Sequence, residues 1–321
     1  MKNNLSLNLS CYTLYRAEFM GIAAIMIILC HATPNLILLP SIVLKVLNIG
    51  NYGVDIFMFI SGLGMFYSLQ NNIGSIKDWY KKRLIRIFIP YLIATFVYCM
   101  VRMHYGSFSL LDTILSLSTI DYWLYHRGAW FVAAIVPLYL ITPFMSKFIE
   151  ARKNKCLTVI IIVSMLIILS KVNIFNNEIC ANIQFVLGRV PMFVIGYYMA
   201  PHIKNGEILK ARYVIIISLI SVALFFFLRI FSALTIPILF ILGYLIQYLH
   251  RLTLIDKIMI FMGGISLESY LTNIYLSSIF RLFDFGDYAY GNYLHYTLVI
   301  LIGIPLAYLI NRTSVGFIAR I

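Results

Sequence analysis

The chain has few charged residues: they make up 12% of its 321 residues, whereas 62% are hydrophobic. A soluble globular domain carries about twice that share of charge, so the composition excludes a soluble fold and indicates an integral membrane protein. Acidic residues are scarcer still, with 12 against 25 basic ones. Because the basic residues lie at the ends of hydrophobic segments and not in one patch, the charge does not indicate nucleic-acid binding.

The chain also has few cysteines, and they are scattered along the sequence. The five cysteines show neither the spacing of a metal site nor obvious disulfide partners. We therefore interpret them as packing residues and expect no metal. The polar start of the chain is followed by an apolar run without a small-residue cleavage site, so the sequence predicts no removable signal peptide.

Long hydrophobic runs are what the chain has instead. Runs able to cross about 30 Å of hydrocarbon as helices occur at residues 16–34, 52–71, 86–104, 129–148, 156–172, 183–202, 212–230, 232–250, 258–280 and 293–312. The loops between them are short, and no linker separates a second unit. We predict an all-α integral membrane protein, a polytopic bundle of about ten transmembrane helices that forms a single domain over residues 1–321.

The basic residues also predict the orientation. Eighteen of them fall in loops and ends on one side, six fall on the other, and Arg189 lies inside a segment. By the positive-inside rule the first side is cytoplasmic, and an even number of crossings places both termini there. We expect a multi-pass protein of the plasma or inner membrane, with His31 and Asp55 near its outer face.

The first hydrophobic run, residues 17–32, carries His31 near its end. A histidine in a membrane helix is costly, so we interpret it as functional, with a structural histidine as the alternative. Asp55 opens the next segment and could approach His31 across a short loop. A carboxylate bonded to one imidazole nitrogen makes the other a better base. Alternatively, Asp55 caps its own helix.

Basic residues follow the second segment. Arg83 and Arg86 lie three apart on one helical face, where they could present two guanidinium forks to a phosphate group, and Lys82 adds a third charge. This pattern suits a nucleotide-containing donor in the cytoplasm. Lipid headgroups together with the positive-inside bias explain it equally well.

Further polar and aromatic side chains lie inside the predicted segments. Arg189 and Glu268 either pair with each other as a structural contact or face a channel. Two loops rich in tyrosine, residues 105–127 and 281–292, either stack on sugar rings or form interfacial belts. The other candidates for a substrate or channel lining are Ser61, Trp130, Tyr139 and Asn273.

Taken together, these blocks resemble the acyltransferase-3 family of membrane acyltransferases over nearly the whole chain. The similarity rests on His31 at the end of the first segment, WFV with downstream Tyr139 and Pro143, and four further blocks in the family's order. These blocks are GVDIFMFISG (53–62), KRLIRIFIPY (82–91), RVPMFVIGYY (189–198) and GGISLESYL (263–271).

The resemblance implies an O-acyltransferase. Its co-substrate would be a cytoplasmic acyl-CoA, commonly acetyl-CoA, and its acceptor a hydroxyl of a cell-surface glycan or of its lipid-linked precursor. His31 would be the catalytic histidine, acting as a base or carrying the acyl group, and Arg83 with Arg86 would match the family's basic pair. The family usually has a basic residue eleven positions before the histidine, where this chain has Met20; Arg16, one turn earlier, could supply that charge.

Two other functions compete with this interpretation. In a transporter or flippase for a glycan, His31, Asp55, Arg189 and Glu268 would line a path and perform no chemistry. The absence of a visible internal repeat makes this function less favoured. The third possibility is a subunit of polysaccharide synthesis or export machinery.

Overall fold

The protein is almost entirely helical. The computed structural model describes residues 6–34, 38–72, 74–172, 177–283 and 288–319. The elements in chain order are β1 (Ser6–Asn8), α1 (Cys11–Leu14), α2 (Arg16–Ala32), α3 (Ser41–Asn48), η1 (Ile49–Tyr52), α4 (Gly53–Gln70), α5 (Ile76–His104), α6 (Leu110–Leu117), α7 (Ile120–Tyr125), α8 (Trp130–Glu150), α9 (Lys155–Leu169), α10 (Glu178–Leu187), α11 (Val190–Lys204), β2 (Ile208–Lys210), α12 (Ala211–Leu228), η2 (Phe231–Leu234), α13 (Thr235–Leu249), α14 (Thr253–Gly264), α15 (Ser266–Phe280) and α16 (Tyr288–Ile318). The two strands pair antiparallel, with Leu7 opposite Leu209.

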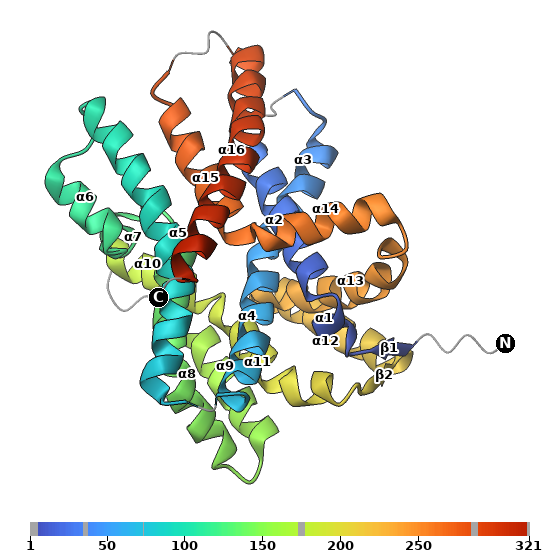
Figure 1. Ribbon diagram of the computed structural model, residues 1–321. Helices are drawn as coiled ribbons and strands as arrows, with labels where there is room; N and C mark the ends of the chain where they lie inside the picture. Colours follow the sequence, from blue (N-terminus) through green and yellow to red (C-terminus); the bar gives the residue numbers. More distant parts are fainter. Residues whose placement is uncertain (1–5, 35–37, 73, 173–176, 284–287, 320–321) are drawn as a thin grey trace.

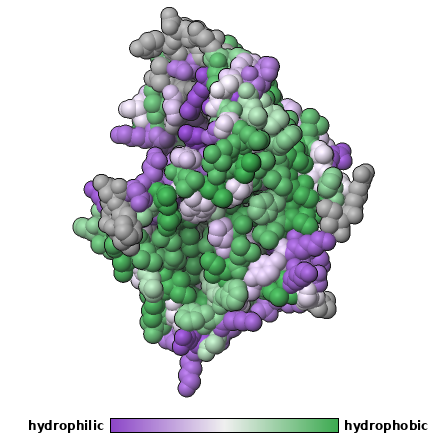
Figure 2. Space-filling view, turned by 90° about the vertical axis from the view of Figure 1, so that its left-hand side faces the viewer, coloured by the Kyte–Doolittle hydropathy of each residue, from purple (hydrophilic) through white to green (hydrophobic). Residues whose placement is uncertain are grey.

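Seven helical segments within the described ranges are long and apolar enough to cross a membrane. Many of their outward side chains are apolar: only 11% of the α12 span is buried inside the protein, and Phe227 on it is 85% exposed. Figure 2 shows a broad hydrophobic face with hydrophilic residues above and below it. Apolar surface of this extent belongs in lipid. The structure therefore confirms a polytopic all-α membrane protein.

Helices also occupy the three remaining segments that the sequence predicts to cross. These are α2, α9 and the pair α14 with α15, and each helix in this group has fewer than 18 residues. Ten crossings, and the cytoplasmic location of both termini, therefore stay predictions.

Two segments predicted as continuous are broken, and the prediction of single helices there is wrong. Residues 183–202 are divided between α10 and α11 at Arg189, because Pro191 opens a new helix in its first turn. Residues 258–280 are divided between α14 and α15 at Ile265, directly after two glycines, which are poor helix formers.

The third crossing helix begins earlier than predicted. Helix α5 starts at Ile76, because the Ser75 hydroxyl accepts a hydrogen bond from the Asp78 amide at 3.1 Å and caps the helix. The basic cluster that includes Lys82 is therefore helical throughout. This fixes which of its side chains share a face.

Helices α4 and α11 pack closely through two glycines. A Cβ on Gly62 would lie 2.0 Å from the Phe193 carbonyl oxygen, and one on Gly196 would lie 2.0 Å from the Phe59 carbonyl oxygen. No side chain fits at either position, so the two backbones touch. These glycines belong to the blocks GVDIFMFISG and RVPMFVIGYY, which are thus two halves of one interface.

Helices α2 and α14 pack in the same way. A Cβ on Gly21 would lie 1.9 Å from the Met259 carbonyl oxygen, and one on Gly263 would lie 1.9 Å from the Ala17 carbonyl oxygen. Helix α2 is thereby held near the centre of the molecule, between α14 and α4 (Figure 1). Its two ends, at Arg16 and His31, lie about 22 Å apart along the helix axis.

Candidate active site

His31 lies in the last turn of α2 and is half-buried. Its Nδ1 atom is 2.8 Å from the Oδ1 atom of Asn273 on α15. The amide nitrogen of Asn273 donates to the Tyr296 hydroxyl at 3.0 Å, and that hydroxyl donates to the Ile28 carbonyl oxygen on α2. Three helices thus hold the imidazole through one continuous chain of hydrogen bonds.

The donor and acceptor roles along these hydrogen bonds determine the tautomer of His31. The single hydroxyl proton of Tyr296 goes to a backbone carbonyl, so the hydroxyl accepts from the amide nitrogen of Asn273. The amide oxygen of Asn273 therefore faces His31, and Nδ1 carries the proton that it accepts. In the neutral ring, Nε2 then has a free lone pair. This is the state that a base or a nucleophile needs.

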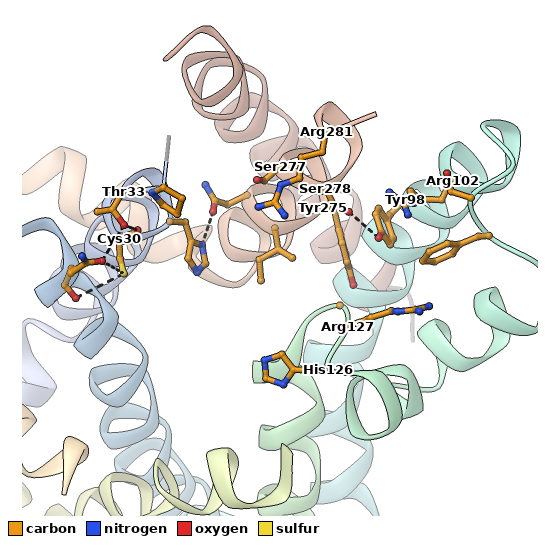
Figure 3. A pocket seen from close by; sticks show the side chains of 18 residues that line it. Cys30, Thr33, Tyr98, Arg102, His126, Arg127, Tyr275, Ser277, Ser278 and Arg281 are labelled. Carbon is orange, nitrogen blue, oxygen red and sulfur yellow. Dashed lines mark hydrogen bonds between the residues drawn. The ribbon is translucent and has the colours of Figure 1, made fainter. Parts of the chain in front are cut away.

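The imidazole lines a cavity of about 790 Å³, which we call the His31 cavity. Its wall is polar and includes Tyr98 and Tyr275, whose rings stack at 4.5 Å between centroids. Figure 3 shows these residues together with Ser277 and Ser278 around one opening. The other lining residues are Cys30, Thr33, Pro34, Asn48, Arg102, Ser107, Phe108, His126, Arg127, Gly128, Asn273, Ile274 and Arg281.

Asp55 does not contact His31, so the prediction that it orients the imidazole is wrong. Its carboxylate forms an ion pair with Arg189, and both side chains are almost fully buried. Arg189 also donates to the Asn51 side chain at 3.1 Å. The alternative that Asp55 caps α4 is wrong too, since no side chain caps that helix. The pair neutralises two buried charges and ties α4 to the start of α11.

The predicted pairing of Arg189 with Glu268 is also wrong, because Arg189 pairs with Asp55. Glu268 on α15 accepts instead from the Asn311 amide at 3.0 Å. Glu268 is 6% exposed and does not line the cavities that the structure describes.

A second, smaller cavity of about 120 Å³ lies nearer the Arg16 end of α2, and we call it the central cavity. Arg16 and Met20 line it together with Ser61 and Tyr139. Arg16 therefore shares a wall with Met20, the position where the family usually has a basic residue. The remaining lining residues are Phe57, Ile87, Phe131, Ile135, Ser266, Leu267 and Tyr270.

Basic residues gather beside the central cavity. Arg16, Arg83 and Arg86 interact electrostatically with one another and with Tyr139. Arg86 and Lys82 also line a third cavity of about 440 Å³, the Arg86 cavity, which opens at the same end of the molecule. Arg86 thus lines the Arg86 cavity, Arg16 lines the central cavity, and Arg83 interacts electrostatically with both arginines.

Helix α15 runs past both the central cavity and the His31 cavity. Tyr270 lines the central cavity, and Asn273 and Ile274 line the His31 cavity. These positions are separated by about one helical turn, or roughly 5 Å along the axis. A chain molecule held at Arg16 would have to span about 22 Å to reach His31, and the wall of α15 between the two cavities makes up about one turn of that distance.

One comparison with known families gives a match. The family model described as "Acyltransferase domain" matches residues 21–312, which is most of the chain. The chain belongs to the acyltransferase-3 family. It is therefore a membrane acyltransferase. Searches of curated proteins and of solved structures gave no match.

Trp130, at the start of α8, is another candidate that lines none of the three cavities. Its ring packs edge-on against Phe185 of α10, with 4.9 Å between centroids. A role of Trp130 toward substrate stays a prediction.

The first of the two tyrosine-rich loops contains both buried and exposed tyrosines. Residues 105–127 contain α6 and α7, where Tyr122 is buried and donates to the Asn182 carbonyl oxygen at 3.2 Å. Tyr105 is 50% exposed. In the second loop, residues 284–287 lie outside the described part of the chain.

Sequence reasoning missed several residues of the site. Tyr296, which sets the direction of the hydrogen-bond chain, sits in a hydrophobic segment without a distinctive motif. Arg102, Arg127 and Arg281 line the His31 cavity, but in the sequence they count only as basic residues of short loops. One signal was available in the sequence. These three arginines fall on the predicted outer side of the membrane, where the positive-inside rule predicts few basic residues.

Glu18, His250 and Asp256 form a cluster at the Arg16 end, away from the three cavities. Their ligand atoms lie within 4.8 Å of one another. His250 is 3.1 Å from Asp256 and 4.0 Å from Glu18. The expectation that the acyltransferase uses no metal stays a prediction.

Proposed function

We propose that this acyltransferase transfers an acyl group, commonly acetyl, from cytoplasmic acyl-CoA to a hydroxyl of a cell-surface glycan or of its lipid-linked precursor. It would do so in the plasma or inner membrane, with the Arg16 end facing the cytoplasm. The observation that supports this most is His31: its Nδ1 is held by Asn273, and its ring lines the largest cavity described.

The chemistry at His31 follows from its tautomer. The Nε2 lone pair can take the proton of an acceptor hydroxyl as the oxygen attacks the thioester carbonyl. The carbon–sulfur bond then breaks, and the imidazolium returns its proton to the leaving thiolate. Alternatively, Nε2 carries the acyl group briefly before the hydroxyl attacks. Both routes need the lone pair that the hydrogen-bond chain leaves free.

The donor would enter from the opposite end. Arg83, Arg86 and Arg16 provide guanidinium forks that suit the phosphates of CoA. The mostly apolar central cavity would then accept the arm that carries the thioester. In this proposal Arg16 supplies the charge that Met20 does not.

The transporter alternative finds less support in the structure. Of the four residues that would line its path, Asp55, Arg189 and Glu268 are buried in contacts with protein. His31 alone among them lines one of the cavities described. A buried ion pair that joins two helices has a structural explanation and does not require a path.

The test uses cells that carry the intact protein, His31→Ala, His31→Gln or no protein. We expect the acyl content of the surface polysaccharide to fall about 10²-fold or more in both variants, the range for loss of a general base, while the amount of polymer stays the same. If polymer instead accumulates inside the cell with unchanged acylation, the protein is a transporter and the proposal is wrong.

A further inference from the structure

Resting on the proposed O-acyl transfer, we propose that the acceptor is acidic: the His31 cavity takes a glycan that carries carboxylate or phosphate groups. Three arginines line this cavity, Arg102, Arg127 and Arg281, and no aspartate or glutamate is among its 18 lining residues.

The three arginines reach the cavity from different elements. Arg102 comes from the last turn of α5, Arg127 from the segment between α7 and α8, and Arg281 from the residue after α15 (Figure 3). Segments far apart in sequence thus place three guanidinium groups around one opening. Like charges repel when they are brought together, so this placement needs a compensating ligand or partner.

Two of the arginines lack an acidic partner among the described residues. The Arg102 guanidinium lies over the Phe108 ring at 5.0 Å from its centroid, and its Nε atom is buried with no hydrogen-bond partner in the described structure. Arg281 forms no ion pair within the same residues. Both groups are therefore free to bind an anion.

Arg127 is partly neutralised and provides a contrast. It lies 3.6 Å from Asp112, a half-buried carboxylate of α6. The Ser109 hydroxyl and backbone amide donate to Asp112 and lower the pKa of that carboxyl, so it stays charged. We therefore assign the main anion contacts to Arg102 and Arg281.

Topology makes the arginines more informative. Six basic residues lie on the predicted outer side of the membrane, and three of these six line the His31 cavity. The positive-inside rule disfavours basic residues in short outer loops. Anchoring to lipid headgroups does not explain the three arginines either, because they line one polar cavity together with His31. An anionic substrate explains both their presence and their convergence.

The test uses purified protein in neutral phosphatidylcholine nanodiscs with acetyl-CoA. The acceptors are a glucuronate oligosaccharide, a phosphate-bearing oligosaccharide and a neutral one of the same length. For Arg102→Gln with Arg281→Gln, we expect the KM for an acidic acceptor to rise about tenfold or more, the range for loss of charged hydrogen bonds. The KM for acetyl-CoA should not change, and the neutral acceptor should remain the poorer substrate for the intact protein.

Each single variant, Arg102→Gln and Arg281→Gln, is also compared with Lys45→Gln, which removes the same one positive charge from a residue that does not line the cavity. Equal turnover of acidic and neutral acceptors, or a raised KM for acetyl-CoA in place of the acceptor, would overturn the proposal.

Binding of each oligosaccharide to the His31→Ala protein without donor separates the two levels of inference. Arginine-dependent binding of an acidic oligosaccharide without any acyl transfer by the intact protein would refute the transferase and keep the anion site. Absence of such binding would refute the anion site by itself.

Discussion

Removal of one hydroxyl at Tyr296 tests the hydrogen-bond chain that prepares His31. Tyr296 is 2% exposed, and its hydroxyl both accepts from Asn273 and donates to the Ile28 carbonyl oxygen. In Tyr296→Phe nothing fixes the amide direction, so Asn273 can turn its nitrogen toward His31. The proton of the imidazole then moves to Nε2, and the lone pair that the reaction needs is lost.

The size of the effect follows from the contacts removed. One buried hydrogen bond contributes about 1 kcal/mol, and a bias of this size changes the ratio of the two tautomers about fivefold. The productive fraction falls by the full ratio only where that tautomer becomes the minor one, so we expect kcat to fall by up to about fivefold in Tyr296→Phe, with an unchanged KM for acyl-CoA. Asn273→Leu removes the partner of Nδ1 altogether, and we expect a loss approaching that of His31→Ala.

A matched variant separates this effect from a general loss of stability. Tyr12 is also buried, and its hydroxyl donates to the Leu239 carbonyl oxygen at 3.0 Å, away from the site. Tyr12→Phe loses a comparable bond, so kcat per folded molecule should be unchanged. In an Asn273→Asp background both oxygens accept from Nδ1, and Tyr296→Phe should then have a smaller effect. Equal kcat values for Tyr296→Phe and Tyr12→Phe in the natural background would refute the tautomer argument.

Two further predictions concern packing and the donor site. Gly263→Ala should lower the melting temperature sharply, because its Cβ would lie 1.9 Å from the Ala17 carbonyl oxygen. The control is Gly264→Ala, whose Cβ meets nothing within 4 Å and which should be neutral or stabilising. Equal melting temperatures of the two variants would contradict the packing of α2 on α14. Met20→Arg should retain or increase turnover, because it adds a second positive charge to the wall of the central cavity beside Arg16. Arg16→Gln should raise the KM for acyl-CoA. Complete loss of activity in well-expressed Met20→Arg would show that the site is built around methionine.

The sequence predicted the class of protein and its family. Hydrophobic runs of membrane-crossing length and the low share of charge determine a polytopic helical protein, because unsatisfied backbone groups are excluded from lipid. His31 and the ordered blocks indicated the acyltransferase-3 family, which the family model confirms. The blocks also contained Gly62 and Gly196, although only the structure shows that these residues face each other.

The partners of the buried polar groups were decided by the tertiary structure alone. From the sequence, Asp55 could meet His31 and Arg189 could meet Glu268, since all four lie in membrane segments. The close packing of α4 on α11 instead brings Asp55 to Arg189 and leaves His31 to Asn273 of α15. Periodicity places a residue on a face of its own helix, but the approach of helices distant in sequence determines which faces meet. For that reason the catalytic candidate could be found in the sequence, whereas its tautomer and its arginine-lined cavity could not.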